Sequence, residues 1–141
     1  MTQPTPQQVA DAMYQRDHTA HALGIQIAQV AHGAATLHMQ VRQDMVNGHD
    51  ICHGGMMATL CDTAFAYACN SYNANTVASG FSIEIIAPAK LGDTLVAVAI
   101  EQVVRGRSGV YDVKLTNQSG DIIALFRGKS RRIEGTVTAE V

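Results

Sequence analysis

The 141-residue sequence lacks the features that would place it in a membrane or on a secretory route. No uncharged apolar run reaches the roughly 20 residues that a membrane-spanning helix needs. The first residues, Met1–Gln8, have neither the basic start nor the apolar stretch of a secretory signal. We therefore expect a cytoplasmic protein that does not act at a membrane.

An excess of charge of one sign is also absent. The net charge is −2, which argues against nucleic acid as a partner. Charged residues make up 16% of the chain and apolar residues 47%, a balance typical of a folded protein rather than a disordered one. The sequence has no repeats, linkers or low-complexity segments, so one domain over residues 1–141 is expected.

Cysteine is scarce, and its number is odd. Cys52, Cys61 and Cys69 cannot all pair within one chain, and their apolar surroundings favour buried free thiols. No base is placed beside Cys61 for thiol catalysis. His49, Cys52 and His53 are close enough in sequence to suggest zinc, but no second cluster supplies a fourth ligand. No metal site is therefore expected.

The apolar pattern predicts one long helix and several strands. The segment 6–23 has helical spacing, and Pro6 suits a first helical turn. A pair of glycines at 54 and 55 opens an Ala- and Met-rich run that predicts a helix to about Tyr72. Alternating apolar and polar residues predict strands over 34–41, 81–86, 94–104, 110–116 and 122–132. This order predicts an α+β fold, in which an antiparallel sheet wraps around a long central helix.

The most informative residue is Asp62, the only Asp, Glu, Lys or Arg between Ile51 and Ile83. A carboxylate in such apolar surroundings loses hydration unless it is paired, which raises its pKa and its basicity. Acids perturbed in this way cluster at functional sites. The alternative is a partly exposed acid on a polar helix stripe, which Thr59, Thr63 and Asn70 would extend. The sequence fits both interpretations.

Motifs around this acid carry a resemblance to a known family. Asn47-Gly-His-Asp-Ile-Cys-His-Gly-Gly is followed by Asp62-Thr-Ala-Phe-Ala-Tyr-Ala-Cys-Asn, and the likeness continues through Gly92-Asp-Thr-Leu and Ala124-Leu-Phe-Arg-Gly-Lys-Ser. Together they resemble the hotdog-fold acyl-CoA thioesterases, and most of all the phenylacetyl-CoA thioesterases of aerobic phenylacetate catabolism, the PaaI type. The resemblance covers nearly the whole chain after the first helix.

The resemblance implies a hotdog fold, and hydrolysis of phenylacetyl-CoA or hydroxyphenylacetyl-CoA to the free acid and coenzyme A. Coenzyme A is then part of the substrate, and no separate cofactor is expected. By the family's pattern, Gly54 donates its N–H to the thioester carbonyl, and Asp62 acts as base or nucleophile. Asn47 and His53 position the site, and Thr63 helps to orient the attacking water.

The chemistry of thioester hydrolysis independently supports these roles. It needs a donor for the developing oxyanion and a carboxylate that attacks or activates water. An amide at a helix N-terminus lies in a positive dipole field, and glycine allows the substrate to approach closely. The Gly-Gly pair and Asp62 therefore supply the two required groups.

The spacing of these two groups predicts a shared site. Gly54 and Asp62 are eight positions apart, which is roughly 12 Å along a helix. They cannot both touch one carbonyl carbon, where contacts of about 3 Å are required. Two antiparallel helices related by a two-fold axis bring Gly54 of one chain to Asp62 of the other. We expect a homodimer with shared active sites, and from the resemblance a homotetramer, unless the Gly-Gly segment is a loop.

Basic residues gather toward the end of the sequence. Arg127, Lys129 and Arg131 alternate on the last predicted strand, and Arg105 and Arg107 flank a turn. Such groups suit the phosphates of coenzyme A, and Arg105, Arg107, Lys129 and Arg131 are the candidate residues. The alternative is an edge strand protected by charge.

Two other functions on the same fold remain open. A hotdog-fold enoyl-CoA hydratase or dehydratase would use a His and a carboxylate for proton transfer at carbon, and His53 with Asp62 resembles such a pair. Its usual Pro-rich approach to the helix is absent. A non-catalytic acyl-CoA-binding protein would need an attached DNA-binding or ligand domain, for which the chain leaves no room. The combined His-Gly-Gly and Asp-Thr pattern favours the thioesterase, since fold alone could not decide.

Overall fold

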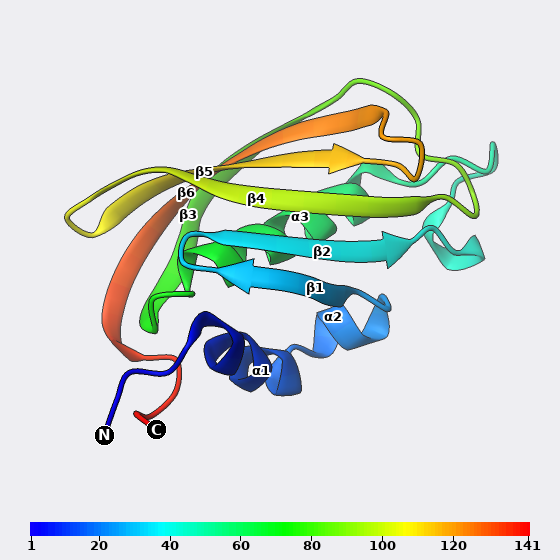
Figure 1. Ribbon diagram of the computed structural model, residues 1–141. Coiled ribbons are helices and arrows are strands. Elements are labelled where there is room, and N and C mark those ends of the chain that lie inside the picture. The colour runs from blue at the N-terminus through cyan, green and yellow to red at the C-terminus, as the bar shows by residue number, and fades with distance from the viewer.

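One long helix, α3 (Gly54–Cys69), lies against one face of a six-stranded antiparallel sheet in the computed structural model, which describes all 141 residues (Figure 1). The strand order across the sheet is β1-β2-β4-β5-β6-β3, so β1 and β3 are the two edges. The strands are β1 (Gln26–Ala31), β2 (Ala34–Gln40), β3 (Ala74–Ile85), β4 (Thr94–Arg105), β5 (Ser108–Thr116) and β6 (Ile122–Thr136). The predicted antiparallel sheet with a long helix against it is confirmed.

The helix α3 forms the centre of the core because it is apolar on almost every side. Nine of its 16 residues are buried, so most of its circumference is covered. Phe65 packs against Tyr111 and Phe126 of the sheet, with ring centroids 5.6 Å and 6.0 Å away. A Cβ at Gly128 would come within 2.8 Å of the Phe65 ring, so this glycine lets the helix approach the sheet. The helix is therefore held at a fixed depth.

Two shorter helices, α1 (Pro6–Arg16) and α2 (His18–Ala22), pack beside β1, and a single 3-10 turn, η1 (Gln43–Met45), follows β2 (Figure 1). A capping box starts α1, in which Thr5 and Gln8 each accept from the other's backbone N–H. The Tyr14 hydroxyl donates to the carbonyl of Ile25 at 2.6 Å, which ties α1 to the start of the sheet. None of the helices has the length and apolar character needed to cross a membrane.

The sequence prediction missed β1 and placed only one strand before the long helix. In β1 only Ile27 and Val30 are even partly buried, and the register shifts between Ile27 and Gln29. That irregularity breaks the two-residue apolar period by which strands are recognised. The absence of a clear alternation therefore reflects an exposed edge strand with a bulge.

Two predicted boundaries were also wrong. The helix expected to reach Tyr72 ends at Cys69, and β3 starts at Ala74 instead of Phe81. The Asn70 side chain accepts from the N–H of Thr76 at 2.9 Å and donates to its carbonyl at 3.0 Å, so it turns the chain directly into β3. A side-chain bridge across six residues leaves no periodic signal in the sequence.

Edge strand β3 extends the sheet beyond the area that α3 covers. Phe81 and Ile85 pair with Gly128 and Ala124 and therefore face the helix side of the sheet. Even so, Phe81 is 51% exposed and Ile85 46% exposed. Monomeric proteins seldom leave a long apolar edge strand open in this way. The helix side of β3 is thus an uncovered part of the core.

Candidate active site

The N-terminus of α3 presents two free backbone donors. Gly54 and Gly55 are its first residues, and their N–H groups donate no hydrogen bond within the chain. The first N–H group of the helix that donates a hydrogen bond within the chain is that of Met56, which bonds to the carbonyl of His53 at 3.0 Å. Unpaired N–H groups at a helix N-terminus form a site for negative charge. The Gly-Gly segment is helical, as the shared-site argument requires.

Gly54 is held against the edge strand. A Cβ at Gly54 would lie 2.9 Å from the Cδ1 atom of Ile85 on β3, whereas a Cβ at Gly55 would meet open space. Glycine at position 54 is therefore needed for close packing of the helix start on β3. This contact places the free donors at the uncovered edge of the sheet.

Asp62 lies two turns further along α3, half-buried and without a partner. Its carboxylate accepts no hydrogen bond within the chain, and neither of the two ion pairs, Arg42–Asp44 and Arg127–Asp112, includes it. Burial raises the pKa of Asp62, and the negative charge of Asp17 raises it further. The predicted increase in the pKa of an isolated carboxylate is confirmed.

Asp17 is a second acid of this region that sequence reasoning missed. It links α1 to α2, where its side chain accepts from the N–H of Ala20 at 3.1 Å and caps α2. Its other oxygen accepts from the hydroxyl of Tyr67 on α3 at 3.2 Å. In the sequence, Asp17 is recognisable only as a possible N-cap. Its proximity to Asp62 is not recognisable, because 45 positions separate the two residues. The tertiary contact with Tyr67 brings its charge to α3.

The alternative interpretation of Asp62, as a partly exposed acid on a polar stripe, is supported in part, because Asp62 and Thr59 are only partly buried whereas Thr63 is buried. The hydroxyl of Thr59 donates to the carbonyl of Gly55 at 2.8 Å, and that of Thr63 donates to the carbonyl of Thr59 at 2.6 Å. Both threonines thus bond to the helix backbone and give nothing to the carboxylate. Because Thr63 is buried and its proton is engaged, its predicted role in orienting water stays a prediction.

Asn47 and His53 occupy the loop that leads into α3. The Asn47 side chain accepts from the N–H groups of His49 and Ile51, at 2.9 Å and 3.2 Å, and so holds the turn together. His53 is the residue before the first helical one, and its exposed ring makes no capping hydrogen bond. Asn47 therefore shapes the approach to Gly54, while the ring of His53 stands free beside it.

Thiol and metal chemistry have no support in the geometry. Cys52, Cys61 and Cys69 are buried and unpaired. Burial, and secondarily the charge of Asp62, raise the pKa of Cys61 to about 12, so almost no thiolate exists near neutral pH. No group of three His, Cys, Asp or Glu side chains is arranged to hold a metal ion.

The four candidate coenzyme A residues, Arg105, Arg107, Lys129 and Arg131, lie far from Gly54 of their own chain. All four are exposed, and none forms an ion pair. Arg131 pairs with Val77, eight positions along β3 from Ile85 and therefore roughly 26 Å from the Gly54 contact. Lys129 and Arg131 also point away from α3, because the alternate residues Gly128 and Ser130 are buried. Within a single chain, these four residues therefore do not lie at the N-terminus of α3.

Comparison with known proteins identifies relatives over almost the whole chain. The family model of the thioesterase superfamily matches residues 49–124. The acyl-coenzyme A thioesterase PaaI of Escherichia coli is 49% identical over 133 residues, which cover 94% of this chain and 95% of that protein. A putative esterase of Archaeoglobus fulgidus is 32% identical over 90% of this chain and 82% of that protein.

Solved structures agree with these relatives. The structure of the E. coli PaaI protein from the phenylacetic acid degradation operon matches with a TM-score of 0.91 and 48% identity, and the match covers 93% of this chain and 95% of that one. A PaaI variant from Thermus thermophilus matches with a TM-score of 0.78 and 31% identity, over 82% of this chain and 98% of that one. The resemblance carried by the His-Gly-Gly and Asp-Thr motifs, and the hotdog fold that it implied, are confirmed.

Removing the unpaired charge of Asp62 should stabilise the fold. Since the folded-state pKa of Asp62 is raised, its ionised form is disfavoured in the native protein, and the resulting cost grows as the pH rises through that pKa. We expect Asp62→Asn to raise the Tm at pH 7 by about 1–3 °C, after allowance for solvent screening. The gain should vanish as the pH falls toward the ordinary pKa of an aspartate. Thermal unfolding across pH measures it.

The exposed acid Asp11 on α1 provides the matched control for this substitution. Asp11→Asn should leave the Tm unchanged both at pH 7 and at a pH near the ordinary pKa of an aspartate. A lower Tm for Asp62→Asn at pH 7 would mean that the native assembly pairs the carboxylate, and would contradict the interpretation of Asp62 as an unpaired base.

Proposed function

This chain belongs to the thioesterase superfamily, and we propose that α3 and edge strand β3 form the active site of an acyl-CoA thioesterase of phenylacetate degradation. Acyl-CoA thioester hydrolysis is the activity of this chain, because its identity to a thioesterase of that activity extends over almost the full length of both proteins. Nothing in these similarities favours the hydratase or the acyl-CoA-binding alternative. The preferred acyl groups are phenylacetyl and hydroxyphenylacetyl.

One observation supports the proposal most strongly: an unpaired carboxylate of raised pKa and two free N–H groups lie on the same apolar helix, α3. A base is most effective when its pKa lies near the working pH, and burial moves Asp62 in that direction. Donors at a helix N-terminus stabilise an oxyanion before any rearrangement is needed. Together these groups supply both halves of a hydrolytic reaction.

The proposed reaction uses these groups in sequence. The N–H of Gly54 donates to the thioester oxygen, and the Asp62 carboxylate takes a proton from water as the water oxygen attacks the carbonyl carbon. The tetrahedral intermediate then collapses, the carbon–sulfur bond breaks, and the coenzyme A thiolate leaves and is protonated. Direct attack by Asp62 would instead form an anhydride that water opens to the same products. Asn47 and His53 line the approach to Gly54, and Thr63 helps to orient the attacking water.

We propose that each active site contains groups from two chains. Gly54 and Asp62 lie on one continuous helix, so about 12 Å separates them along its axis. Antiparallel pairing of β3 with β3 of a second copy would cover the exposed Phe81 and Ile85 and continue the sheet. The same two-fold axis places the helices side by side in opposite directions. Two such dimers form the proposed homotetramer.

The proposed pairing of two β3 strands would also place the basic residues of one chain near the other chain's α3. The end of the sheet that carries Arg105, Arg107 and Arg131 lies beside the C-terminal end of α3. In an antiparallel dimer, that end approaches the N-terminal end of the other chain's α3, where Gly54 lies. We therefore keep these residues, with Lys129, as the proposed contacts of the coenzyme A phosphates. No separate cofactor is proposed, and the proposed location is the cytoplasm.

Activity toward a panel of thioesters tests the function. We expect kcat/KM to be highest for phenylacetyl-CoA and its hydroxylated forms, and lower for short straight-chain acyl-CoA esters. In Asp62→Asn the shape remains but the base is lost, so kcat should fall at least ~10²-fold with little change in KM. Release of the free thiol measures both quantities. A variant that keeps more than a tenth of wild-type turnover would rule out Asp62 as the base.

The charge of Asp17 should set the acidic limb of the pH profile. Asn at this position keeps one oxygen that can cap α2, and its amide NH2 can donate to the Tyr67 hydroxyl oxygen in place of the lost acceptor. Asp17→Asn therefore removes the charge and reverses the hydrogen bond to Tyr67. Because Asp17 raises the pKa of Asp62, the acidic limb of kcat/KM should move to lower pH in the variant. Measuring kcat/KM from about pH 4 to about pH 8 tests this, because that range begins near the ordinary pKa of a carboxyl group and extends well above it. Asp11→Asn is the control, and an unmoved limb in both variants contradicts the coupling.

Complementation tests the shared site. A Gly54→Pro chain lacks the donor N–H, and an Asp62→Asn chain lacks the carboxylate. In a mixed dimer, both defects fall in one site and the other site is intact. Refolding equal amounts together should restore up to about a quarter of wild-type activity, because half of the dimers are mixed. Gly54→Pro must first be shown to dimerise; verified mixed dimers without activity would exclude a site built from two chains.

A further inference from the structure

A hollow of about 480 Å³ lies at the C-terminal end of α3, beyond the groups that take part in the proposed reaction. Its walls come from the ends of α1, α3 and β6 and from the start of β3, and its polar side chains include Arg16, Asp17, Asn70 and Asn75. The volume is within the range of pockets that bind small ligands, about 300–1,000 Å³. We call this space the polar hollow.

The polar hollow is adjacent to Asp62. Asn70, in its wall, follows Asp62 by about two helical turns, and Ala66 lies between them, one turn from each. Asp17, also in the wall, is close enough to raise the pKa of Asp62. Ala66 is partly exposed and carries only a methyl group, so the surface of α3 between Asp62 and the polar hollow is open to a ligand.

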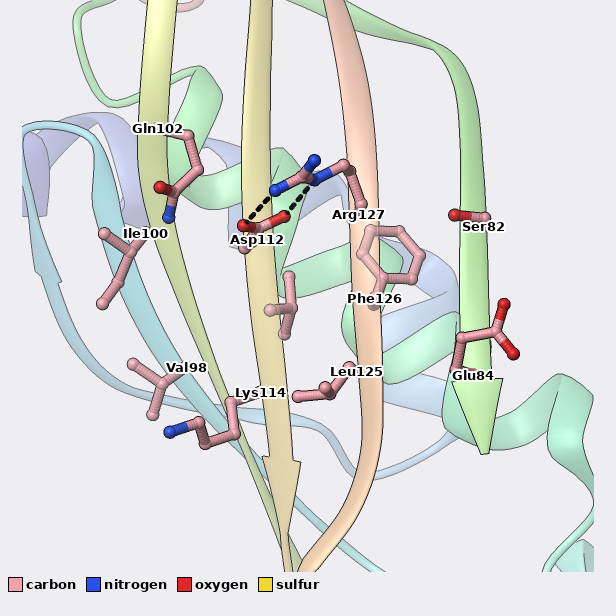
Figure 2. A pocket seen from close by; sticks show the side chains of 11 residues that line it. Ser82, Glu84, Val98, Ile100, Gln102, Asp112, Lys114, Leu125, Phe126 and Arg127 are labelled. Atoms are coloured by element: carbon pink, nitrogen blue, oxygen red, sulfur yellow. Dashed lines mark hydrogen bonds and ion pairs between the residues drawn. The ribbon is translucent and has the colours of Figure 1, made fainter. Parts of the chain in front are cut away.

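A second hollow, on the sheet, is in the wrong place to serve Asp62. Figure 2 shows this space, of about 660 Å³, around the Asp112–Arg127 ion pair. Because Asp112 alternates along β5 with the buried Tyr111 and Val113, this second hollow opens on the side that faces away from α3. The sheet therefore separates it from Asp62.

The length of an arylacetyl group matches the path from Asp62 to the polar hollow. In such a group about 6 Å separates the carbonyl carbon from a hydroxyl oxygen at the far side of the ring, by standard bond lengths. One turn of α3 covers a similar distance, about 5.4 Å. A carbonyl carbon attacked beside Asp62 therefore allows the ring to lie over Ala66, with its hydroxyl group at the mouth of the polar hollow.

Two charged side chains in the wall of the polar hollow have unused hydrogen-bonding capacity. Arg16 donates once within the chain, to the carbonyl of Val137 at 3.3 Å, and its guanidinium has further donors. Asp17 accepts from Ala20 and Tyr67, one bond on each oxygen, although a carboxylate has about four acceptor positions. Neither side chain forms an ion pair. A hydroxyl group, which donates and accepts at once, can use both.

The chain already contains phenols that bind to carboxylates in this way. Tyr67 is itself a phenol, and its hydroxyl donates to Asp17 at 3.2 Å. One oxygen of Glu101 accepts from two phenols at once, the hydroxyls of Tyr72 and Tyr111, at 2.9 Å and 3.0 Å. The phenol of a substrate would be the second at Asp17. Hydrogen bonds to an ionised carboxylate are roughly twice as strong as those between neutral groups.

We propose that the polar hollow is the acyl subsite, in which Asp17 and Arg16 recognise a hydroxyl group on the aryl ring; this rests on the proposed function, which places the carbonyl carbon beside Asp62. The ring hydroxyl donates to Asp17 and accepts from Arg16. Capping of α2 requires only an oxygen, which Ser or Asn also supplies, so capping does not explain a negative charge at position 17. Recognition of a phenol does.

Exposure sets the expected strength of this recognition. A fully buried site that bonds a substrate hydroxyl rejects the substrate without it by about 10⁴-fold, because its polar groups are then left without partners. Arg16 is exposed and Asp17 only partly buried, so water replaces a missing hydroxyl group. We therefore expect a preference of about tenfold for the hydroxylated ring.

The ratio of kcat/KM for 4-hydroxyphenylacetyl-CoA to that for phenylacetyl-CoA tests this subsite. It should be about ten in the wild type and about one in Asp17→Ser, which keeps a capping oxygen and removes the carboxylate. Losing the charge of Asp17 also affects Asp62, but equally for both substrates, so that effect cancels in the ratio. Arg16→Met should lower the ratio in the same direction. Asp11→Ser, on α1 outside the polar hollow, is the control and should leave it unchanged.

Binding of analogues that cannot be hydrolysed separates this subsite from the proposed activity. The analogues of the two substrates are ketones, with a methylene group between the sulfur and the carbonyl carbon. By calorimetry, the wild type should bind the hydroxylated analogue about tenfold more tightly than the unsubstituted one. Asp17→Ser and Arg16→Met should bind the two nearly alike. Circular dichroism checks the fold of each variant.

Each outcome supports or contradicts the proposed subsite. If the wild type does not distinguish the two analogues, or if the folded variants keep the wild-type preference, the polar hollow does not recognise the ring hydroxyl. If the wild type hydrolyses neither thioester but loses its preference between the analogues in the variants, the subsite is supported and the proposed function is wrong. Because Arg16 is exposed, Arg16→Met decides the question even where Asp17→Ser does not fold.

Discussion

The removal of one carboxylate from water is the constraint on which the rest of this structure depends. Asp62 lies half-buried on a largely apolar helix, and no cation of the chain pairs with its charge. Burial and the nearby Asp17 both disfavour the ionised form. A fold gains little stability from such a residue, and perturbed carboxylates of this kind cluster at functional sites, which supports the proposed role of Asp62.

The geometry of α3 is the basis of the proposed dimer. A helix supplies free donors only at its first turn, and a residue eight positions later is too far away to act on the same atom. The sheet matches this need, because β3 extends beyond the cover of α3 and leaves Phe81 and Ile85 open to a second copy. The dimer that we propose would cover the exposed residues of β3 and would also complete the proposed active site. In that proposal, association serves both burial and catalysis.

The two faces of the sheet serve different purposes. On the inner face, Gly128 and the aromatic residues Tyr111 and Phe126 fix the position of Phe65 and hence of α3. On the side that faces away from α3, Asp112 and Arg127 form an ion pair, whereas Lys114 and Glu84 form none within the chain. Both faces of β4 are apolar, since Val96 and Val98 alternate with the buried Leu95, Ala97 and Ala99.

The sequence by itself determined the helix, most strands, the isolation of Asp62 and the glycine donors, because each depends on local pattern. Apolar period, turn residues and a lone charge are readable from neighbours in the chain. Only the tertiary structure revealed β1, whose bulge breaks the period, and the end of α3, which the Asn70 side chain sets by bonding to Thr76. Tertiary structure alone also decided that Asp17 acts on Asp62, and that Lys129 points away from α3. Those features depend on contacts between distant segments, and chain folding, rather than local preference, creates such contacts.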